Sequence, residues 1–83
     1  MERETVFATL IDIMEADTGA SYPDLKENAD LRQDLGLDSV DVVSIVSQVE
    51  RRFRVRLSQT ELERLVTVKN VVDLVHGKIK ETV

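Results

Sequence analysis

The chain has 83 residues, a formal net charge of −5 and no cysteine. This length suits one small domain spanning residues 1–83, whose core cannot depend on disulfides or on cysteine-bound metal. The acidic balance argues against nucleic acid as a partner, and no apolar run is long enough to cross a bilayer. The charged N-terminal segment lacks a signal-peptide pattern, so we expect a cytoplasmic protein without a membrane partner.

The first predicted element is a helix over about residues 4–16. Apolar residues recur there at helical intervals and share one face: Val6, Phe7, Leu10, Ile13 and Met14. Gly19 is the expected terminator of this helix. The loop that follows is long for so small a domain, and long loops in compact domains are often functional. Its leucines are expected to pin it to the core, with room for a short helical turn near residues 31–34: Leu25, Leu31, Leu35 and Leu37.

A second helix is predicted over residues 39–53, where apolar residues again recur at helical spacing: Val42, Val43, Ile45, Val46, Val49 and Phe53. Ser39 then lies in the first turn of this helix. Taken alone, a serine there is most often an N-cap, whose hydroxyl accepts a hydrogen bond from a free N–H group. The same position also suits a phosphodiester on Ser39, because free N–H groups and the positive end of the helix dipole favour an anion.

Residues 53–57 alternate between apolar and polar, which is typical of a strand, but the sequence offers no second strand to pair with them. We therefore expect an extended connector that buries Val55 and Leu57. Ser58 and Glu61 have the spacing of a capping box. They predict a short helix over about residues 59–65, with Leu62 and Leu65 as its buried positions.

The last helix is predicted from residue 68 or 69 to His76, with Gly77 as its terminator or a looser continuation through Lys80. These elements predict an all-α fold: a small antiparallel bundle of three main helices plus one short helix, with a long first loop. His76 is the only histidine, and the acidic loop does not have the spacing of an EF-hand. We expect no catalytic residue and no dedicated metal site.

Directly before and at the start of the predicted second helix the chain reads Asp34-Leu35-Gly36-Leu37-Asp38-Ser39-Val40. With the apolar helix that follows, to Phe53, this stretch resembles the acyl carrier protein family. In that family the serine of an Asp-Ser-Leu motif carries a 4′-phosphopantetheine arm, and here the motif reads Asp38-Ser39-Val40 after Asp34-Leu35-Gly36-Leu37. The segment Val66-Thr67-Val68-Lys69-Asn70-Val71 follows in the family's order, so the resemblance covers nearly the full chain. It implies a free-standing, non-enzymatic carrier of acyl thioesters with Ser39 as attachment point. The arm would supply the thiol that a chain without cysteine lacks.

The resemblance also implies partners: a phosphopantetheinyl transferase, which supplies the metal and the base for attachment, and acyl-loading and chain-processing enzymes such as a ketosynthase or an acyltransferase. The carrier itself is expected to be a monomer. Recognition by these enzymes would use residues at the start of the second helix and along it: Asp38, Val40, Asp41, Ser44, Glu50 and Arg51. An apolar cleft that could shelter the acyl chain would be framed by Val40, Val43, Val46, Val49, Leu62 and Val68.

The second helix departs from the family in its charge. Fatty-acid carriers usually have acidic residues along its exposed side, whereas this chain has Ser44, Ser47 and Gln48 there and arginines at its end: Arg51, Arg52, Arg54 and Arg56. These arginines are either a solvated helix end or a docking contact for a specific partner. The departure favours a specialised fatty-acid or polyketide-type pathway.

Two alternatives stay open. A peptidyl or aminoacyl carrier is the same device with another cargo, although the aspartate before Ser39 favours the acyl type. A carrier-like interaction module would never receive the arm, and Ser39 would then be only a helix cap.

Overall fold

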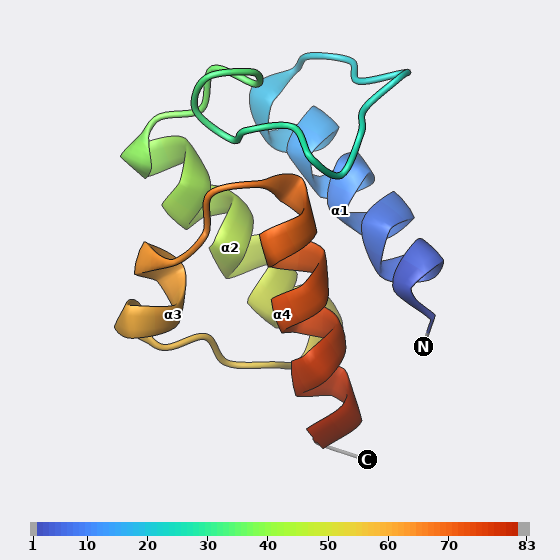
Figure 1. Ribbon diagram of the computed structural model, residues 1–83, viewed down its shortest axis with the longest axis vertical. Coiled ribbons are helices and arrows are strands. Elements are labelled where there is room, and N and C mark those ends of the chain that lie inside the picture. Colours follow the sequence, from blue (N-terminus) through green and yellow to red (C-terminus); the bar gives the residue numbers. More distant parts are fainter. Residues whose placement is uncertain (1, 82–83) are drawn as a thin grey trace.

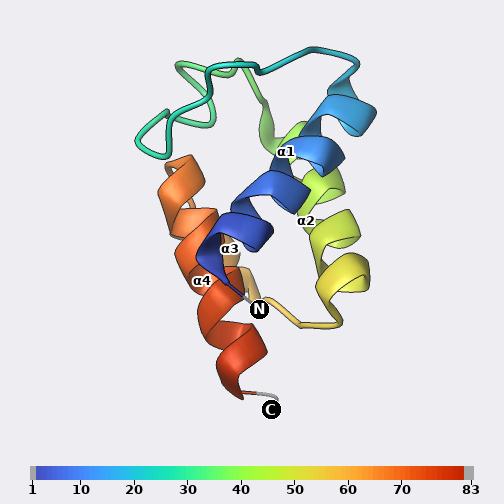
Figure 2. The same ribbon diagram turned by 90° about the vertical axis from the view of Figure 1, so that its right-hand side faces the viewer.

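The computed structural model describes residues 2–81, which form four helices: α1 (Arg3–Thr18), α2 (Ser39–Phe53), α3 (Gln59–Glu63) and α4 (Val68–Glu81). Residues 2–81 contain no β-strand, and one isolated bridge joins Asp30 to Thr67. Helix α1 packs against both α2 and α4 and runs in the opposite direction to them (Figure 1). The long loop between α1 and α2 crosses one end of the bundle (Figures 1 and 2). The all-α fold predicted from the sequence is confirmed.

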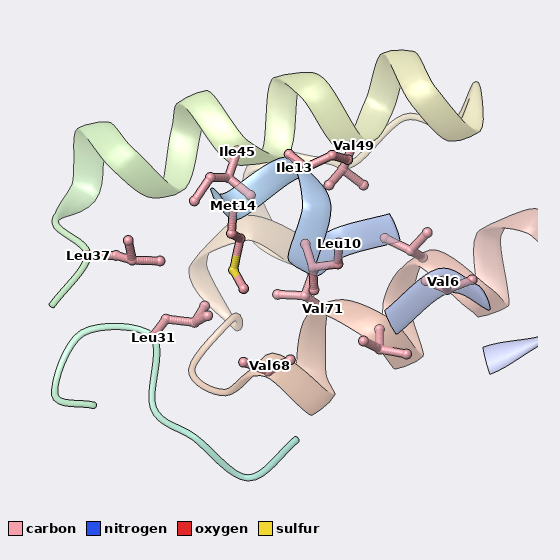
Figure 3. Close-up of a cluster of buried hydrophobic side chains, with 12 residues drawn as sticks. Val6, Leu10, Ile13, Met14, Leu31, Leu37, Ile45, Val49, Val68 and Val71 are labelled. Atoms are coloured by element: carbon pink, nitrogen blue, oxygen red, sulfur yellow. The ribbon is translucent and has the colours of Figure 1, made fainter. Parts of the chain in front are cut away.

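The core lies where the apolar faces of α1, α2 and α4 meet (Figure 3). Helix α1 buries residues that its spacing predicts, and Gly19 ends the helix in the left-handed conformation with a φ of 75°. In α2 the buried residues are Ile45, Val46 and Val49. Contrary to the expectation for this face, Val43 is 57% exposed. At about 100° per residue, it lies outside the stripe that Val46 and Val49 share with their helical neighbours.

The connector and the short helix agree only partly with the sequence prediction. Val55 and Leu57 are buried in an extended connector, as expected, and Ser58 and Glu61 form the predicted capping box. Helix α3 ends at Glu63 rather than near residue 65, and none of its residues is buried. A helix of five residues has little more than one turn, which leaves few side chains to bury. It lies at one side of the bundle (Figure 1).

Of the two ends expected for the last helix, termination at Gly77 is wrong, because α4 continues to Glu81. Glycine ends helices where the chain must adopt a positive φ, but Gly77 keeps a helical backbone here. Two contacts hold the extra turn in place. Lys78 Nζ pairs with Glu61 Oε2 of α3 at 3.0 Å, and Ile79 packs against the core. Tertiary contacts therefore override the local helix-breaking tendency of glycine.

Candidate functional site

The loop before α2 is anchored on both sides of a tight turn. Leu31 and Leu37 are buried beside Met14 (Figure 3), while Gly36 between them has a φ of 70°, which glycine adopts without steric cost. The Leu31 N–H donates to the Val66 carbonyl at 2.9 Å, and the Leu37 N–H donates to the Leu31 carbonyl at 3.0 Å. The predicted leucine anchors are thereby confirmed in part, since Leu25 and Leu35 are half-buried. This anchoring fixes where α2 begins.

Asp38, and not Ser39, is the N-cap of α2. The Asp41 N–H donates to Asp38 Oδ1 at 2.9 Å, and the Asp38 N–H donates to Asp41 Oδ2 at 3.3 Å, which completes a capping box. Ser39 is the first residue of the helix itself. The interpretation of Ser39 as the cap is therefore wrong. Aspartate caps a helix as well as serine does, and here it is the residue with the extended backbone of an N-cap.

The hydroxyl of Ser39 is left free by this arrangement. Ser39 is exposed, and its Oγ has no hydrogen-bond partner among residues 2–81. The backbone N–H groups of Ser39 and Val40 also lack a partner within that part of the chain. A phosphodiester on Ser39 would therefore have unpaired donors and the positive end of the helix dipole beside it. The site fits a covalently attached phosphate group.

Most of the other residues predicted for partner recognition make contacts within the protein. Asp38 and Asp41 form the capping box described above. Ser44 Oγ donates to Asp17 Oδ1 at 2.7 Å, and Gln48 Nε2 donates to the same oxygen at 2.8 Å. Both hydrogen bonds join α2 to the end of α1. Glu50 Oε2 accepts the Leu57 N–H at 3.1 Å and so fixes the connector. Their role in recognition stays a prediction, with a structural role beside it.

Val40 and Arg51 are the two predicted recognition residues whose side chains are exposed and have no partner among residues 2–81. Val40 is 75% exposed, and Val43, one turn further along α2, is 57% exposed. The exposure of Val43 was not expected from the apolar spacing of the helix. A helical projection of α2 could have predicted it, because Val43 falls outside the stripe formed by the other apolar residues.

A small apolar cavity lies between α1, α2, the loop and α4. Its lining is Leu10, Met14, Leu31, Leu37, Val42, Ile45, Val46 and Val71. The space open to the centre of a water molecule is about 10 Å³, so the cavity has room for about one water and none for an acyl chain. Of the residues expected to frame an acyl cleft, Val46 alone lines this cavity, and Val40 and Val43 face solvent.

Residues 2–81 show neither a metal site nor a membrane span. No group of three or more histidine, cysteine, aspartate or glutamate side chains there is arranged to hold a metal ion. None of the helices in that part of the chain combines the length and apolar content needed to cross a membrane.

Comparison with known proteins places the chain in a family. Residues 8–75 match the family model described as a phosphopantetheine attachment site. The acyl carrier protein of Saccharopolyspora erythraea is 36% identical over 89% of this chain and 78% of its own length. That of Thermotoga maritima is 32% identical over 93% of this chain and 95% of its own length.

Solved structures agree with these relatives. The crystal structure of the Thermotoga maritima acyl carrier protein superposes with a TM-score of 0.92 at 29% identity, covering 100% of this chain and 96% of that one. The acetyl actinorhodin acyl carrier protein of Streptomyces coelicolor, at 18% identity, has the same fold with a TM-score of 0.72 over 100% of this chain and 95% of that one. The chain therefore belongs to the acyl carrier protein family, whose members are not enzymes and hold 4′-phosphopantetheine covalently.

Proposed function

We propose that Ser39 is the attachment point of the 4′-phosphopantetheine arm, and that the protein is a free-standing carrier of acyl thioesters for a specialised fatty-acid or polyketide-type pathway. One observation supports this proposal above the others. Asp38 caps α2, so the adjacent Ser39 keeps an exposed hydroxyl that the fold does not use. If the Ser39 hydroxyl were the cap, it would have to lose its hydrogen bond from a backbone N–H before it could be modified.

Different residues of the chain have different roles at this site. The capping box of Asp38 and Asp41 holds the first turn of α2, and the free N–H groups of Ser39 and Val40 lie beside the position of the phosphate. Leu31 and Leu37 are buried in the core and so fix the loop that precedes α2. When bound, the arm supplies the thiol that forms the thioester with the acyl group.

The cargo is proposed to enter the apolar cavity beneath α2. That cavity is closed to anything larger than about one water in this structure, so α2 and the loop would have to separate to admit an acyl chain. Met14 is suited to such a change, because its unbranched side chain adapts to irregular spaces. Short acyl groups need no such opening and would stay outside.

The proposal is tested by intact mass. Incubation with coenzyme A, magnesium and a broad-specificity phosphopantetheinyl transferase should add the mass of one phosphopantetheine. Ser39→Ala should abolish the gain. Ser21→Ala is the matched control, because Ser21 is an exposed serine outside α2 whose side chain has no hydrogen-bond partner among residues 2–81, and its loss should leave the gain unchanged. Uptake by Ser39→Ala would refute the assignment of Ser39, and no uptake by the unmodified wild type would refute the carrier function.

A further inference from the structure

The end of α2 furthest from Ser39 carries a concentration of positive charge. Arginines occupy two positions of the last turn of α2 and two of the connector: Arg51, Arg52, Arg54 and Arg56. All are exposed, and none has an ion-pair partner among residues 2–81. The ion pairs of that part of the chain are made instead by Arg3 and Lys78. We call these four residues the arginine end of α2.

This positive charge contrasts with the net negative charge of the chain. Residues 1–41 contain eleven acidic and three basic residues, whereas residues 42–83 contain five acidic and eight basic residues. The helix dipole accounts for Arg51 and Arg52, since cations are stabilising in the last turn of a helix. Arg54, the C-cap, also lies at the negative end of the helix, whereas Arg56 lies two residues further on and is not explained by the dipole.

Arg54 carries a conformational cost. It has a φ of 57° and a ψ of 46°, the left-handed region that favours glycine at the end of a helix. A side chain there is unfavourable, because its Cβ crowds the neighbouring carbonyl. Glycine would close α2 with less strain and would lose only the charge. The backbone at this position therefore favours glycine, and Arg54 adds its charge to this surface despite that cost.

The arginines also surround a hollow. Ser47, Glu50, Arg51, Arg54, Val55 and Arg56 line a surface depression of about 520 Å³. Glu50 is its one carboxylate, and this carboxylate accepts the Leu57 N–H, which keeps it in the wall of the hollow. The hollow is therefore lined by three arginines against one carboxylate, a balance of charge that suits acidic side chains of another protein.

We propose that the arginine end of α2 is the docking contact for an acidic surface on a dedicated enzyme that works on the arm. The proposal rests on the proposed function, because it takes Ser39 as the point where the enzyme reaches the arm. Ser39 and Arg51 are twelve residues apart in one helix, which corresponds to roughly 18 Å at 1.5 Å per residue. The enzyme should therefore present carboxylates about 18 Å from its arm entrance and an apolar contact for Val40 and Val43 nearer to it.

The magnitude expected of such a contact is modest. An exposed charge pair contributes about 0.2–1 kcal/mol, which corresponds to about 1.4- to 5-fold in affinity. Charges of this kind act mainly on the association rate and on the discrimination between partners. An enzyme with a basic docking surface would meet repulsion here. The arginine end therefore selects partners rather than supplying most of the binding energy.

The test measures direct binding of the whole protein to two ketosynthases, one with mainly aspartate and glutamate around its arm entrance and one with mainly lysine and arginine. Direct binding does not require the arm, so failure of the proposed function, seen by intact mass, is distinguishable from failure of this inference. The variant is Arg51→Gln with Arg54→Gly, in which glycine suits the left-handed position and preserves the fold. Arg64→Gln is the matched control, because Arg64 is an exposed arginine outside the arginine end.

At an ionic strength of about 0.01 M, the variant should bind the acidic ketosynthase about 2- to 25-fold more weakly than wild type and the basic one more tightly. At about 0.15 M the differences should shrink, since the Debye length falls from about 30 Å to about 8 Å. Equal responses of the two ketosynthases, or an equal effect of Arg64→Gln, would overturn the proposal. So would loss of binding on adding inorganic phosphate at constant ionic strength, which would indicate a small-anion site, or self-association that the variant abolishes.

Discussion

The division of roles between two neighbouring residues can be tested by their effects on stability. Asp38 caps α2 through the 2.9 Å hydrogen bond from the Asp41 N–H, whereas the Ser39 hydroxyl has no partner among residues 2–81. Asp38→Ala should therefore destabilise the protein by about 1 kcal/mol, within the range of about 0.5–2 kcal/mol for loss of a helix cap. Ser39→Ala should change the free energy of unfolding by less than about 0.5 kcal/mol, as for most surface substitutions.

Thermal unfolding followed by far-ultraviolet circular dichroism resolves this difference. For a domain of this size a loss of about 1 kcal/mol lowers Tm by roughly 4–8 °C. Asp38→Ala should show that shift, and Ser39→Ala should melt within about 2–4 °C of wild type. Asp38→Ser is the matched control: a serine at the cap position can still accept the Asp41 N–H, so most of the stability should be retained.

The results that would refute this reasoning are specific. Equal destabilisation by Ser39→Ala and Asp38→Ala would mean that the Ser39 hydroxyl does contribute to the cap. A Tm of Asp38→Ala equal to that of wild type would mean that the bond between Asp38 and Asp41 adds nothing in solution. Either outcome would remove the main support for Ser39 as a free hydroxyl.

Two more predictions concern the loop that presents Ser39 and the response to acid. Leu37→Ala should lower the free energy of unfolding, measured by urea denaturation, by about 2–5 kcal/mol, because Leu37 is only 5% exposed. Leu25 is half-buried, so Leu25→Ala is the comparison, and an equal or smaller loss in Leu37→Ala would contradict the role of Leu37 as an anchor. The pKa of Asp30 lies below its ordinary value of 3.8, chiefly because the Gln33 N–H donates to its carboxylate. The pKa of Glu61 lies below its ordinary value of 4.5, chiefly because the backbone N–H of Ser58 donates to its carboxylate. The stabilisation that these two carboxylates contribute is therefore fully present above about pH 4.5. It is lost as the pH falls through their lowered pKa values in the folded protein. Asp30→Asn should therefore make Tm less sensitive to pH below about pH 3.8, the ordinary pKa of Asp30, and an unchanged pH profile would show that this carboxylate does not contribute.

The sequence alone was sufficient to predict the elements whose signals are local. The bounds of α2 agree with the prediction of residues 39–53, because the strong apolar period of this helix is visible in consecutive residues. Gly19 and the capping box of Ser58 with Glu61 were predicted correctly for the same reason. The motif around Ser39 is likewise contiguous, so its residues were enough to indicate the family.

Other features depended on contacts between segments far apart in the chain. Local propensity favoured an end of α4 at Gly77, but the pairing of Lys78 with Glu61 and the packing of Ile79 carry the helix further. Ser44 was predicted to be a recognition residue, and the structure shows that it binds Asp17, which lies 27 positions earlier. Neither partner is visible from the neighbourhood of the residue itself.

The candidate site shows the same limit most clearly. The sequence offered Ser39 as the candidate cap, but the neighbouring Asp38 is of a residue type that caps a helix equally well. The tertiary structure decides, because Leu31 and Leu37 are buried on either side of the left-handed Gly36 and so fix the residue at which the helix begins. The lining of the cavity likewise comes from α1, the loop, α2 and α4 together. Periodicity and capping determined which segments are helical, whereas burial between distant segments decided which side chains remain free to bind.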